Sequence, residues 1–375
     1  MKRIAFICYK GFGADGISSF IINNYRQFDH SEIKCSLIYP RIIGEQKIAS
    51  KYLTELTNNG DNTYLVPKKG SIIKYFFNLK SILSTGKYDV AHIHGSSGSI
   101  VLEMFAAKCA GIKHIIPHSH NTTGNHVLLH KMCMPFVKHL SSIRLSCGID
   151  AGKWMYGKSS FYVIPNGINI EKYCFSDNIR TQTRKELGIR DDELIIGHVG
   201  GFNHQKNQEF LIRFAAYVKR NLPCFKFHLL LIGKGYRQIF NQNLAKDLQV
   251  DSCVSFLGQR TDVANLFQAM DVFFLPSLFE GFPIVGIEAQ AAGLPTFMSC
   301  NITKDAELTD LVKWLPIDKG FDCWLQALQS TKINNESRAL YAYKVAQKGF
   351  NIKEAAKVLE KVYLNNKGHE FERSY

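Results

Sequence analysis

Residues 271–295 read DVFFLPSLFEGFPIVGIEAQAAGLP, and this stretch decides the fold. An apolar run that ends at Pro276 is typical of a buried strand, and a loop with Glu280 follows it. Proline suits the first turn of a helix, so we expect a helix to begin at about Pro283. The N-terminus of that helix would carry partial positive charge and free N–H groups, which bind anions. Glu288 would lie ~7–8 Å beyond the first turn, so two carboxylates bracket a predicted phosphate site.

Strand-like and helical runs alternate on both sides of this stretch, which predicts parallel sheets with helices on both faces. The series restarts after a Pro-Asn-Gly turn at 165–167. We therefore expect an α/β protein of two Rossmann-like domains, residues 1–175 and 176–351, that face a central cleft. A last helix within 352–375 would pack back on the first domain. The expected strands are residues 3–9, 33–39, 90–94, 114–118, 161–164, 194–199, 227–232, 254–257, 272–276 and 296–299.

A glycine-rich loop follows the first expected strand. Residues 11–16 read GFGADG, which fits G-x-G-x-x-G in the strand-to-helix setting that dinucleotide binding requires. That function also needs an acidic residue at the end of the second strand to hold a ribose, and Arg41 stands near that point instead. A nicotinamide enzyme is therefore disfavoured. A loop that meets phosphate or substrate and a tight turn without a ligand both stay open.

Several motifs resemble those of the retaining glycosyltransferase family 4, which has the GT-B fold. Glu280 and Glu288 match the E-x7-E signature of that family, and the surrounding DVFFLPS, EGFP and EAQAAGLP make the match specific. The similarity covers most of the chain, and the members that this sequence resembles most build bacterial capsular polysaccharide or exopolysaccharide. The other matching segments are residues 118–121, 163–167, 198–207, 231–235 and 254–258.

The resemblance implies roles for residues of the second domain. Glu288 would hold the ribose hydroxyls of a nucleotide, and Glu280 would contact the donor sugar. Lys206 matches the basic residue that neutralises the diphosphate in the family. The remaining donor-binding residues would be Gly281, Phe282 and Pro283 near the phosphates and Leu257 beside the base.

In the first domain, the resemblance places His120 near the donor sugar, with His118 as the alternative. Gly13 and Gly16 match the glycine loop of the family's first domain and are expected to contact the donor. The two histidines could also serve as zinc ligands, but no third and fourth ligand at suitable spacing follows them in the sequence. Histidines with a purely structural role remain an alternative, and we expect no metal.

One departure from the family pattern lies at Gly201, where the family usually has an arginine that joins the lysine at the phosphates. An arginine–phosphate contact is charge-assisted and often bidentate, so its loss matters. His204 or Arg260 could compensate. The alternative is a weak or non-catalytic GT-B subunit that acts with a partner transferase.

The implied reaction moves a sugar from a nucleoside diphosphate, with UDP favoured, to a saccharide acceptor that is lipid-linked, in surface polysaccharide synthesis. The family retains the anomeric configuration. The sequence contains no D-x-D motif, so we expect Lys206 and the helix N-terminus near Pro283 to stabilise the leaving phosphate without a metal ion or other cofactor. An epimerase or a phosphorylase on the same fold is a rival enzyme class.

Composition and net charge limit the classes of binding partner that we expect. The formal net charge is +14, which favours anionic partners, but no arginine-rich run or zinc-finger spacing supports nucleic acid. Ten scattered cysteines without a C-x-x-C pair suit a reducing cytoplasm. Residues 68–80 and 130–139 mix basic with large apolar side chains, as interfacial helices do. We expect a cytoplasmic protein with peripheral contact to the inner face of the membrane, although such helices can also face their own core.

Overall fold

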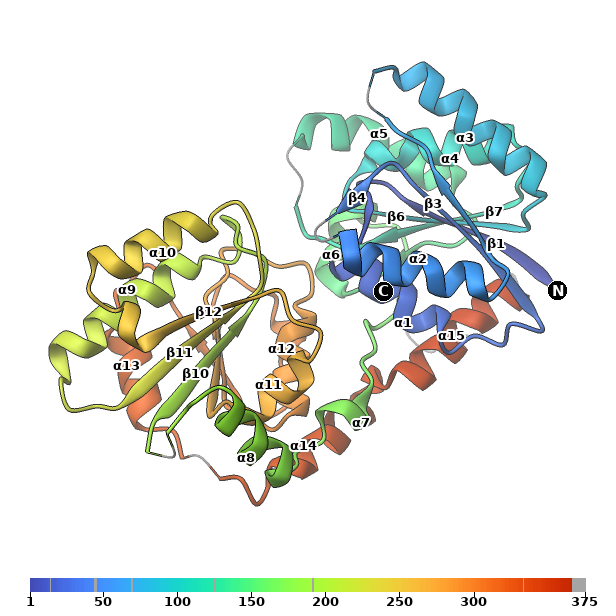
Figure 1. The fold of residues 1–375 in the computed structure, drawn as a ribbon. Helices are drawn as coiled ribbons and strands as arrows, with labels where there is room; N and C mark the ends of the chain where they lie inside the picture. The colour runs from blue at the N-terminus through green and yellow to red at the C-terminus, as the bar shows by residue number, and fades with distance from the viewer. Residues whose placement is uncertain are drawn as a thin grey trace. The chain divides into compact units, whose positions relative to one another are not determined.

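The structure, a computed structural model, describes residues 1–13, 15–43, 46–68, 70–123, 126–190, 192–332 and 334–365. The chain divides into two compact units, and Figure 1 shows that each has a sheet with helices on both sides. Unit 1 consists of residues 1–167 together with the chain from Ile352 onward, and unit 2 of Ile168–Asn351. The two segments that join the units pair with each other, because Ile168 forms a parallel bridge to Asn351.

Unit 1 is built on a parallel sheet of seven strands in the order β5-β3-β1-β6-β7-β8-β9. Its central strands are apolar and fully buried, as expected for a sheet that is covered on both faces. The strands are β1 (Lys2–Cys8), β3 (Ile33–Tyr39), β5 (Asn62–Leu65), β6 (Val90–Gly95), β7 (His114–Ser119), β8 (Leu145–Ser146) and β9 (Tyr162–Val163).

Two sets of helices cover the two faces of this sheet. The helices α1 (Gly16–Tyr25), α2 (Gln46–Asn58) and α15 (Ile352–Asn365) pack on one face, where α15 contributes Ala356, Leu359, Val362 and Tyr363 to the core. The helices α3 (Ile72–Gly86), α4 (Val101–Cys109), α5 (Val127–Leu140) and α6 (Ile149–Tyr156) pack on the other. The helix from the end of the chain therefore completes the core of unit 1 (Figure 1).

Unit 2 repeats this design with six parallel strands in the order β12-β11-β10-β13-β14-β15. The helices α9 (Gln208–Asn221), α10 (Gln238–Asp247) and α13 (Asp322–Gln329) close one face over a core that includes Trp324. On the other side, α12 (Ile284–Ala291) packs on β13 and β14, next to α14 (Arg338–Val345). The strands are β10 (Leu194–Val199), β11 (Phe227–Ile232), β12 (Val254–Gly258), β13 (Val272–Leu275), β14 (Thr296–Ser299) and β15 (Val312–Leu315).

Each sheet reverses its strand order at one place. In unit 1 the chain adds strands outward from β1 on one side and then continues with β6 on the other side; in unit 2 the same reversal falls between β10 and β13. Loops after two such neighbouring strands diverge, so parallel α/β sheets bind ligands at these switch points. The candidate site residues should therefore lie at the carboxyl ends of β1 and β6 and of β10 and β13.

The α/β class and the parallel sheets predicted from the sequence are confirmed. The sequence pattern did not indicate β5 or β8, which are short and carry few apolar residues, nor β15, which is apolar but only half-buried at the edge of its sheet. The structure divides the chain after Gly167 rather than after residue 175, because α7 (Ile170–Tyr173) packs against helices of unit 2. No helix among the described residues is long and apolar enough to cross a bilayer.

Candidate functional site

In unit 2, the loops after β10 and β13 are joined at the switch point. The Leu278 N–H donates to the Gln205 carbonyl oxygen at 2.8 Å, and the Asn207 side-chain amide donates to the Pro276 carbonyl at 3.1 Å. Asn207 is held in the left-handed conformation, with φ of 54°. These bonds fix the two loops on which the predicted residues Lys206 and Glu280 lie.

Lys206 and Glu280 form an ion pair in which Nζ lies 2.7 Å from Oε1. Only 16% of the Lys206 side chain and 8% of the Glu280 side chain are exposed, so the pair is screened little by solvent. The Gln205 side-chain amide donates to the other carboxylate oxygen, Oε2, at 3.1 Å. The pair brings a positive and a negative group to the end of the sheet, and an anion that displaced the carboxylate would find the ammonium already in place.

Glu288 lies on the second turn of α12 and accepts a hydrogen bond from the Tyr173 hydroxyl at 2.6 Å. Burial raises the pKa of Glu288, whereas the bond from Tyr173 and the charge of Lys206 both act to lower it. Tyr173 lies on α7. Burial raises the pKa of its phenol well above the ordinary value, and the nearby Glu288 carboxylate raises it further. The carboxylate is thus held by one donor, and its remaining lone pairs can accept bonds from hydroxyl groups.

The helix α12 begins at Ile284, directly after Pro283, as the sequence predicts. Pro283 is the N-cap and provides no side-chain hydrogen bond to the first turn. Phe282 is 9% exposed and stacks on Phe350 with ring centroids 5.4 Å apart, which anchors the loop that precedes the helix. The early N–H groups of α12 therefore lack a capping side chain among the described residues. These N–H groups and the helix dipole both favour an anion at this end of the helix.

The backbone at Gly201, where the arginine of the family is missing, is not crowded. A Cβ atom at Gly201 would lie 3.5 Å from the Lys234 carbonyl oxygen, an ordinary contact, so the backbone has room for a side chain. Arg260 forms a bidentate pair with Asp262 at 2.8 and 2.6 Å, and His204 is exposed. Lys234 lies at the same strand ends, since its Cε would be 3.7 Å from a Cβ at Gly258.

Leu257 lies in β12, two strands away from β10 in the sheet, and is half-buried. Gly258 follows it with φ of 67°, and the register between β11 and β12 shifts at this point. The structure therefore places Leu257 at the strand ends of the same unit as Lys206, Glu280 and Glu288, on the far side of β11.

In unit 1, the glycine loop after β1 is held by its own side chains. The Asp15 carboxylate caps α1 by accepting from the Ser18 N–H at 2.8 Å, and the Ser18 hydroxyl accepts from the Gly13 N–H at 2.9 Å. Gly13 has φ of 154°, and a Cβ there would overlap the Ile43 carbonyl oxygen. Gly16 is the first residue of α1 and is exposed. Gly13 thus has a structural reason to be glycine, and its contact with a donor stays a prediction.

His118 and His120 point to the same face of the unit 1 sheet and join two further histidines, His92 and His94 of β6. His92 Nε2 lies 3.1 Å from His118 Nδ1, and His94 Nδ1 lies 2.9 Å from His120 Nε2. His118 is fully buried, whereas His120 is partly exposed, so only His120 can reach a ligand without a rearrangement. Burial lowers the pKa of His120 to about 3 and keeps this ring neutral.

Comparison with known proteins agrees with this arrangement. Residues 179–307, which contain Lys206, Glu280 and Glu288, match the family described as glycosyl transferases group 1. The chain carries a group 1 glycosyltransferase domain. It is 29% identical over 96% of its length to the glycosyltransferase EpsF of Bacillus subtilis, of which it covers 96%. It is also 28% identical, over 66% of its length and 68% of the relative's, to an Escherichia coli UDP-Gal:α-D-GlcNAc-diphosphoundecaprenol α-1,3-galactosyltransferase.

Solved structures share the fold of this glycosyltransferase. HepE of Anabaena in complex with UDP-glucose superposes with a TM-score of 0.76 at 16% identity, over 96% of this chain and 99% of HepE. WaaG, a glycosyltransferase involved in lipopolysaccharide biosynthesis, gives 0.66 at 16% identity, over 96% and 99%. The fold of the protein is GT-B, and the protein is a glycosyltransferase.

Sequence reasoning missed three residues of these clusters. Tyr173 lies 115 positions from Glu288 in the sequence, and no spacing rule connects them. His92 and His94 could have been found from the pairing of β6 with β7, since two H-x-H segments on neighbouring parallel strands place their rings on one face. The partners of His118 precede it in the chain, and the residues that follow it offer no ligands at suitable spacing.

Proposed function

We propose that this glycosyltransferase transfers a sugar from a nucleoside diphosphate sugar, with UDP favoured, to a lipid-linked saccharide with retention of anomeric configuration. The observation that supports this most is the Lys206–Glu280 pair at the switch point of unit 2, beside a helix without a side-chain cap. HepE binds UDP-glucose, and the E. coli relative uses UDP-galactose and a diphosphoundecaprenol acceptor. We propose that it acts in the cytoplasm in the synthesis of surface polysaccharide; WaaG, which shares the fold, is involved in lipopolysaccharide biosynthesis.

The proposed chemistry follows from charge. When the bond between the anomeric carbon and the diphosphate breaks, negative charge collects on the departing phosphate oxygens. Lys206 and the N–H groups at the start of α12 are positioned to stabilise that charge, and preorganised groups of this kind contribute the largest share of many rate enhancements. Lys234 is a second cation for the diphosphate in place of the usual arginine. We propose that this set makes a metal ion at the diphosphate unnecessary.

The remaining residues are assigned to the nucleoside and the sugar. Glu288 would accept hydrogen bonds from the ribose hydroxyls, because it retains free lone pairs while Tyr173 holds it in place. Glu280 would turn from Lys206 to the hydroxyls of the donor sugar once phosphate takes its place. His120 is the proposed first-unit contact to the sugar. In the retaining mechanism, the departing phosphate helps to deprotonate the acceptor hydroxyl.

The test is calorimetric binding of UDP, GDP and ADP, each with and without EDTA. We expect one nucleotide to bind, unaffected by EDTA, and Glu288→Ala to weaken it by about 1–3 kcal/mol, as loss of a charged hydrogen-bond partner does. Glu307→Ala is the matched control, because Glu307 lies in the same unit outside this site. Binding that needs added metal, or that keeps wild-type affinity in Glu288→Ala, would refute the assignment.

A non-catalytic subunit is the second candidate, and the observation that favours it is Gly201. The space at this position allows Gly201→Arg without a backbone clash. If the phosphate site is incomplete, this variant should bind the nucleotide about tenfold more tightly, as a charge-assisted contact would provide. Equal affinity in the two proteins, together with turnover of a labelled donor, would dismiss the subunit hypothesis.

We also propose that the outer surface of unit 1 docks on an anionic bilayer. Eight of the eighteen large hydrophobic side chains found exposed in the described structure lie on α3 and α5. The two helices contain no acidic residue, while they carry basic ones such as Lys74, Lys80, Lys131 and Lys138. Both pack against α4, and their inner residues Tyr75, Leu79 and Val137 face the core.

This docking surface is defined by Ile72, Ile73, Phe77, Leu128 and Met132, whose exposed fractions range from 59% to 74%. Apolar side chains flanked by cations are what inserts at the headgroup level of anionic membranes. Such docking would bring unit 1 to a lipid-linked acceptor.

Vesicle co-sedimentation tests the docking surface. We expect the protein to bind vesicles that contain phosphatidylglycerol at low salt, to dissociate at high salt, and to ignore pure phosphatidylcholine. Leu128→Asn with Met132→Asn should abolish binding. Ile239→Asn with Phe240→Asn, a pair of exposed apolar residues on α10 in unit 2, is the matched control. Equal loss in both double variants, or no binding to anionic vesicles, would overturn the proposal.

A further inference from the structure

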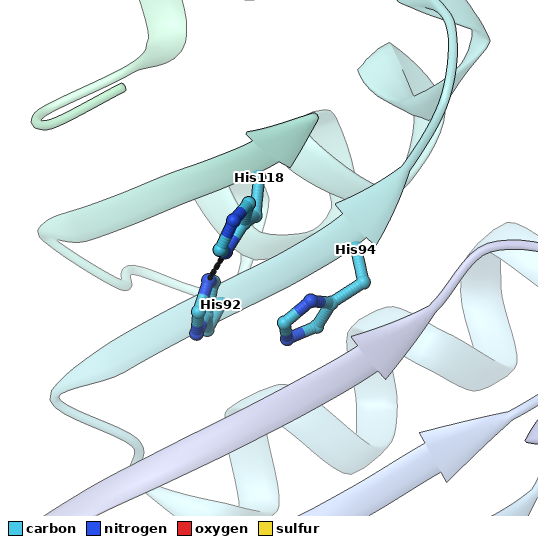
Figure 2. Close-up of side chains that lie close together, drawn as sticks. All are labelled: His92, His94 and His118. Atoms are coloured by element: carbon cyan, nitrogen blue, oxygen red, sulfur yellow. Dashed lines mark hydrogen bonds between the residues drawn. The ribbon is translucent and has the colours of Figure 1, made fainter. Parts of the chain in front are cut away.

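Four histidine rings form an array on one face of the unit 1 sheet, and three of them are fully buried. Figure 2 shows His92 and His94 on β6 and His118 on β7, with their rings turned toward one another. One ring nitrogen of each lies within 4.8 Å of those offered by the other two. The proposed mechanism uses the fourth ring, His120, as a contact to the sugar and assigns no role to these three.

The hydrogen bonds leave nitrogens of this array without a partner. His94 Nε2 and His118 Nε2 are buried and form no hydrogen bond to the residues that the structure describes. A buried polar atom without a partner costs about 1–3 kcal/mol, so an ion that bound His94 Nε2 would recover part of that cost. Burial lowers the pKa of all three rings well below the ordinary value, and a neutral imidazole is the form that ligates metals.

The surroundings also resemble those of a metal ligand set. His92 Nδ1 lies 2.6 Å from the hydroxyl of Tyr363 on α15. If His92 donates from Nδ1 to that oxygen, its Nε2 carries a lone pair, which lies 3.1 Å from His118 Nδ1. Two nitrogens bound to one zinc ion at ~2.0–2.1 Å are about 3.3 Å apart. A second-shell partner that fixes the tautomer is typical of metal-binding histidines.

Charge requires a fourth, anionic ligand, because three neutral imidazoles leave a buried divalent ion uncompensated. Cys8 is the candidate by its register, although its Sγ is not among the ligand atoms that lie within 4.8 Å of one another. Burial raises the pKa of its thiol, so Cys8 would have to lose its proton and turn toward the rings when the ion binds. Cys8 is 1% exposed and pairs in register with His94, one strand away from it. Phe6, two residues earlier and hence on the same face, contacts the rings of His92 and His94. A thiolate at this position would halve the charge, and imidazole with thiolate is a ligand set that selects zinc.

We infer that His92, His94 and His118, with Cys8 as the fourth ligand, form a structural Zn²⁺ site in the core of unit 1. The site would join β1, β6 and β7 directly and, through Tyr363, the C-terminal helix. It lies within unit 1 and is separate from the nucleotide residues of unit 2, so this inference does not depend on the proposed function.

Metal content of the full chain tests the site first. The protein is produced without a polyhistidine tag, dialysed against buffer free of metals, and analysed by mass spectrometry of the elements. We expect about one zinc per chain, since a closed structural site binds one ion. Replacement by Co²⁺ should give the visible absorption of a tetrahedral ion, with a near-ultraviolet thiolate band that Cys8→Ser removes.

Tyr363→Phe tests the surroundings of the site without disturbing a ligand. Loss of the hydroxyl should weaken zinc affinity about tenfold in competition with a chromophoric chelator, as second-shell changes do. Tyr156→Phe is the matched control, because Tyr156 is equally buried in unit 1 and its hydroxyl donates to two carbonyl oxygens. This control should keep wild-type affinity.

Three results would overturn the inference. They are a chain with no zinc after growth in zinc-supplemented medium, a Co²⁺ spectrum typical of octahedral surface binding, and equal affinity in the two tyrosine variants. Nucleotide binding serves as an independent readout. A protein that binds UDP but no zinc refutes the metal site alone, and one that binds zinc but no nucleotide refutes the donor site alone.

Discussion

The two units share one architecture, but the side chains at their switch points differ in charge. At β10 and β13, unit 2 presents a charged pair, a second carboxylate and a helix whose first turn has no side-chain cap. At β1 and β6, unit 1 caps its helix with Asp15 and gathers neutral imidazoles in a dry core. The same topology thus supports a site for an anionic ligand in one unit and a sealed polar cluster in the other.

The difference predicts that a glycine-rich loop and a helix N-terminus bind phosphate only where their N–H groups are free and a cation lies nearby. In unit 1, Ser18 and Asp15 already use the N–H groups of Gly13 and Ser18. In unit 2, no side chain caps α12, and Lys206 provides positive charge nearby. Three predictions sharpen this comparison.

The largest expected effect is acid unfolding of unit 1 before unit 2. Burial lowers the pKa of His92, His94, His118 and His120, so the folded state keeps these rings neutral while the unfolded chain binds protons below about pH 6.5. The free energy of unfolding should therefore fall with pH below that value, by up to about 5 kcal/mol per pH unit for four rings. Bound zinc would deepen the effect, because protons compete for its ligands.

Hydrogen exchange followed by mass spectrometry checks this prediction by segment. Peptides from β6 and β7 should lose protection between pH 6 and pH 5, whereas those from β10 and β13 remain protected. Unit 2 provides the control, because it contains one comparable ring, His198, whose pKa burial lowers to about 4. Simultaneous loss of protection in both units would contradict the comparison.

The second prediction concerns the charged switch point. Lys206→Ala would leave the Glu280 carboxylate, which is 8% exposed, without its ion partner. We expect a loss of about 3 kcal/mol in the free energy of unfolding and loss of measurable nucleotide binding. Lys226→Ala is the control, because Lys226 and Asp192 form an exposed ion pair, which contributes little to stability. Urea unfolding measures both, and equal effects would show that the Lys206 pair is not a special site.

The smallest effect separates a structural glycine from an open one. Gly13→Ala meets a positive φ and the Ile43 carbonyl oxygen, so unit 1 should lose about 1–3 kcal/mol. Gly201→Ala faces contacts of 3.5 and 3.6 Å and should change stability by less than about 0.5 kcal/mol. Thermal unfolding compares the stability of the two variants directly. If Gly13→Ala is as stable as the wild-type protein, the structure does not require glycine at this position, and ligand binding remains the explanation for the loop.

Much of the fold could be predicted from the sequence because its strands are long apolar runs between helices. β3, β10, β11 and β14 have the predicted bounds, since their ends coincide with turn residues. The sequence does not predict β5, because this strand has the polar sequence NTYL and lies at the edge of the sheet with two exposed positions. Edge strands bury less apolar surface, so their sequences carry a weaker signal.

The candidate site could be predicted only in part, for a different reason. Motif spacing predicts Glu280, Glu288 and Lys206 as site residues, because each lies in a segment with its own local pattern, and the structure pairs Lys206 with Glu280. Tyr173 and the pairing of His92 with His118 depend on which strands and helices become neighbours. The helix α15 packs on unit 1, where the sequence predicts that the last helix lies.

The position of α15 has a consequence for the order in which the protein is made. A ribosome completes unit 2 at Asn351, before it has added the helix that closes unit 1. Until residues 352–365 emerge, the core of unit 1 lacks Leu359, Val362 and Tyr363, and His92 lacks its phenol partner. Unit 1 is therefore synthesised first but completes its fold last. A premature stop codon within α15 would leave the core of unit 1 incomplete.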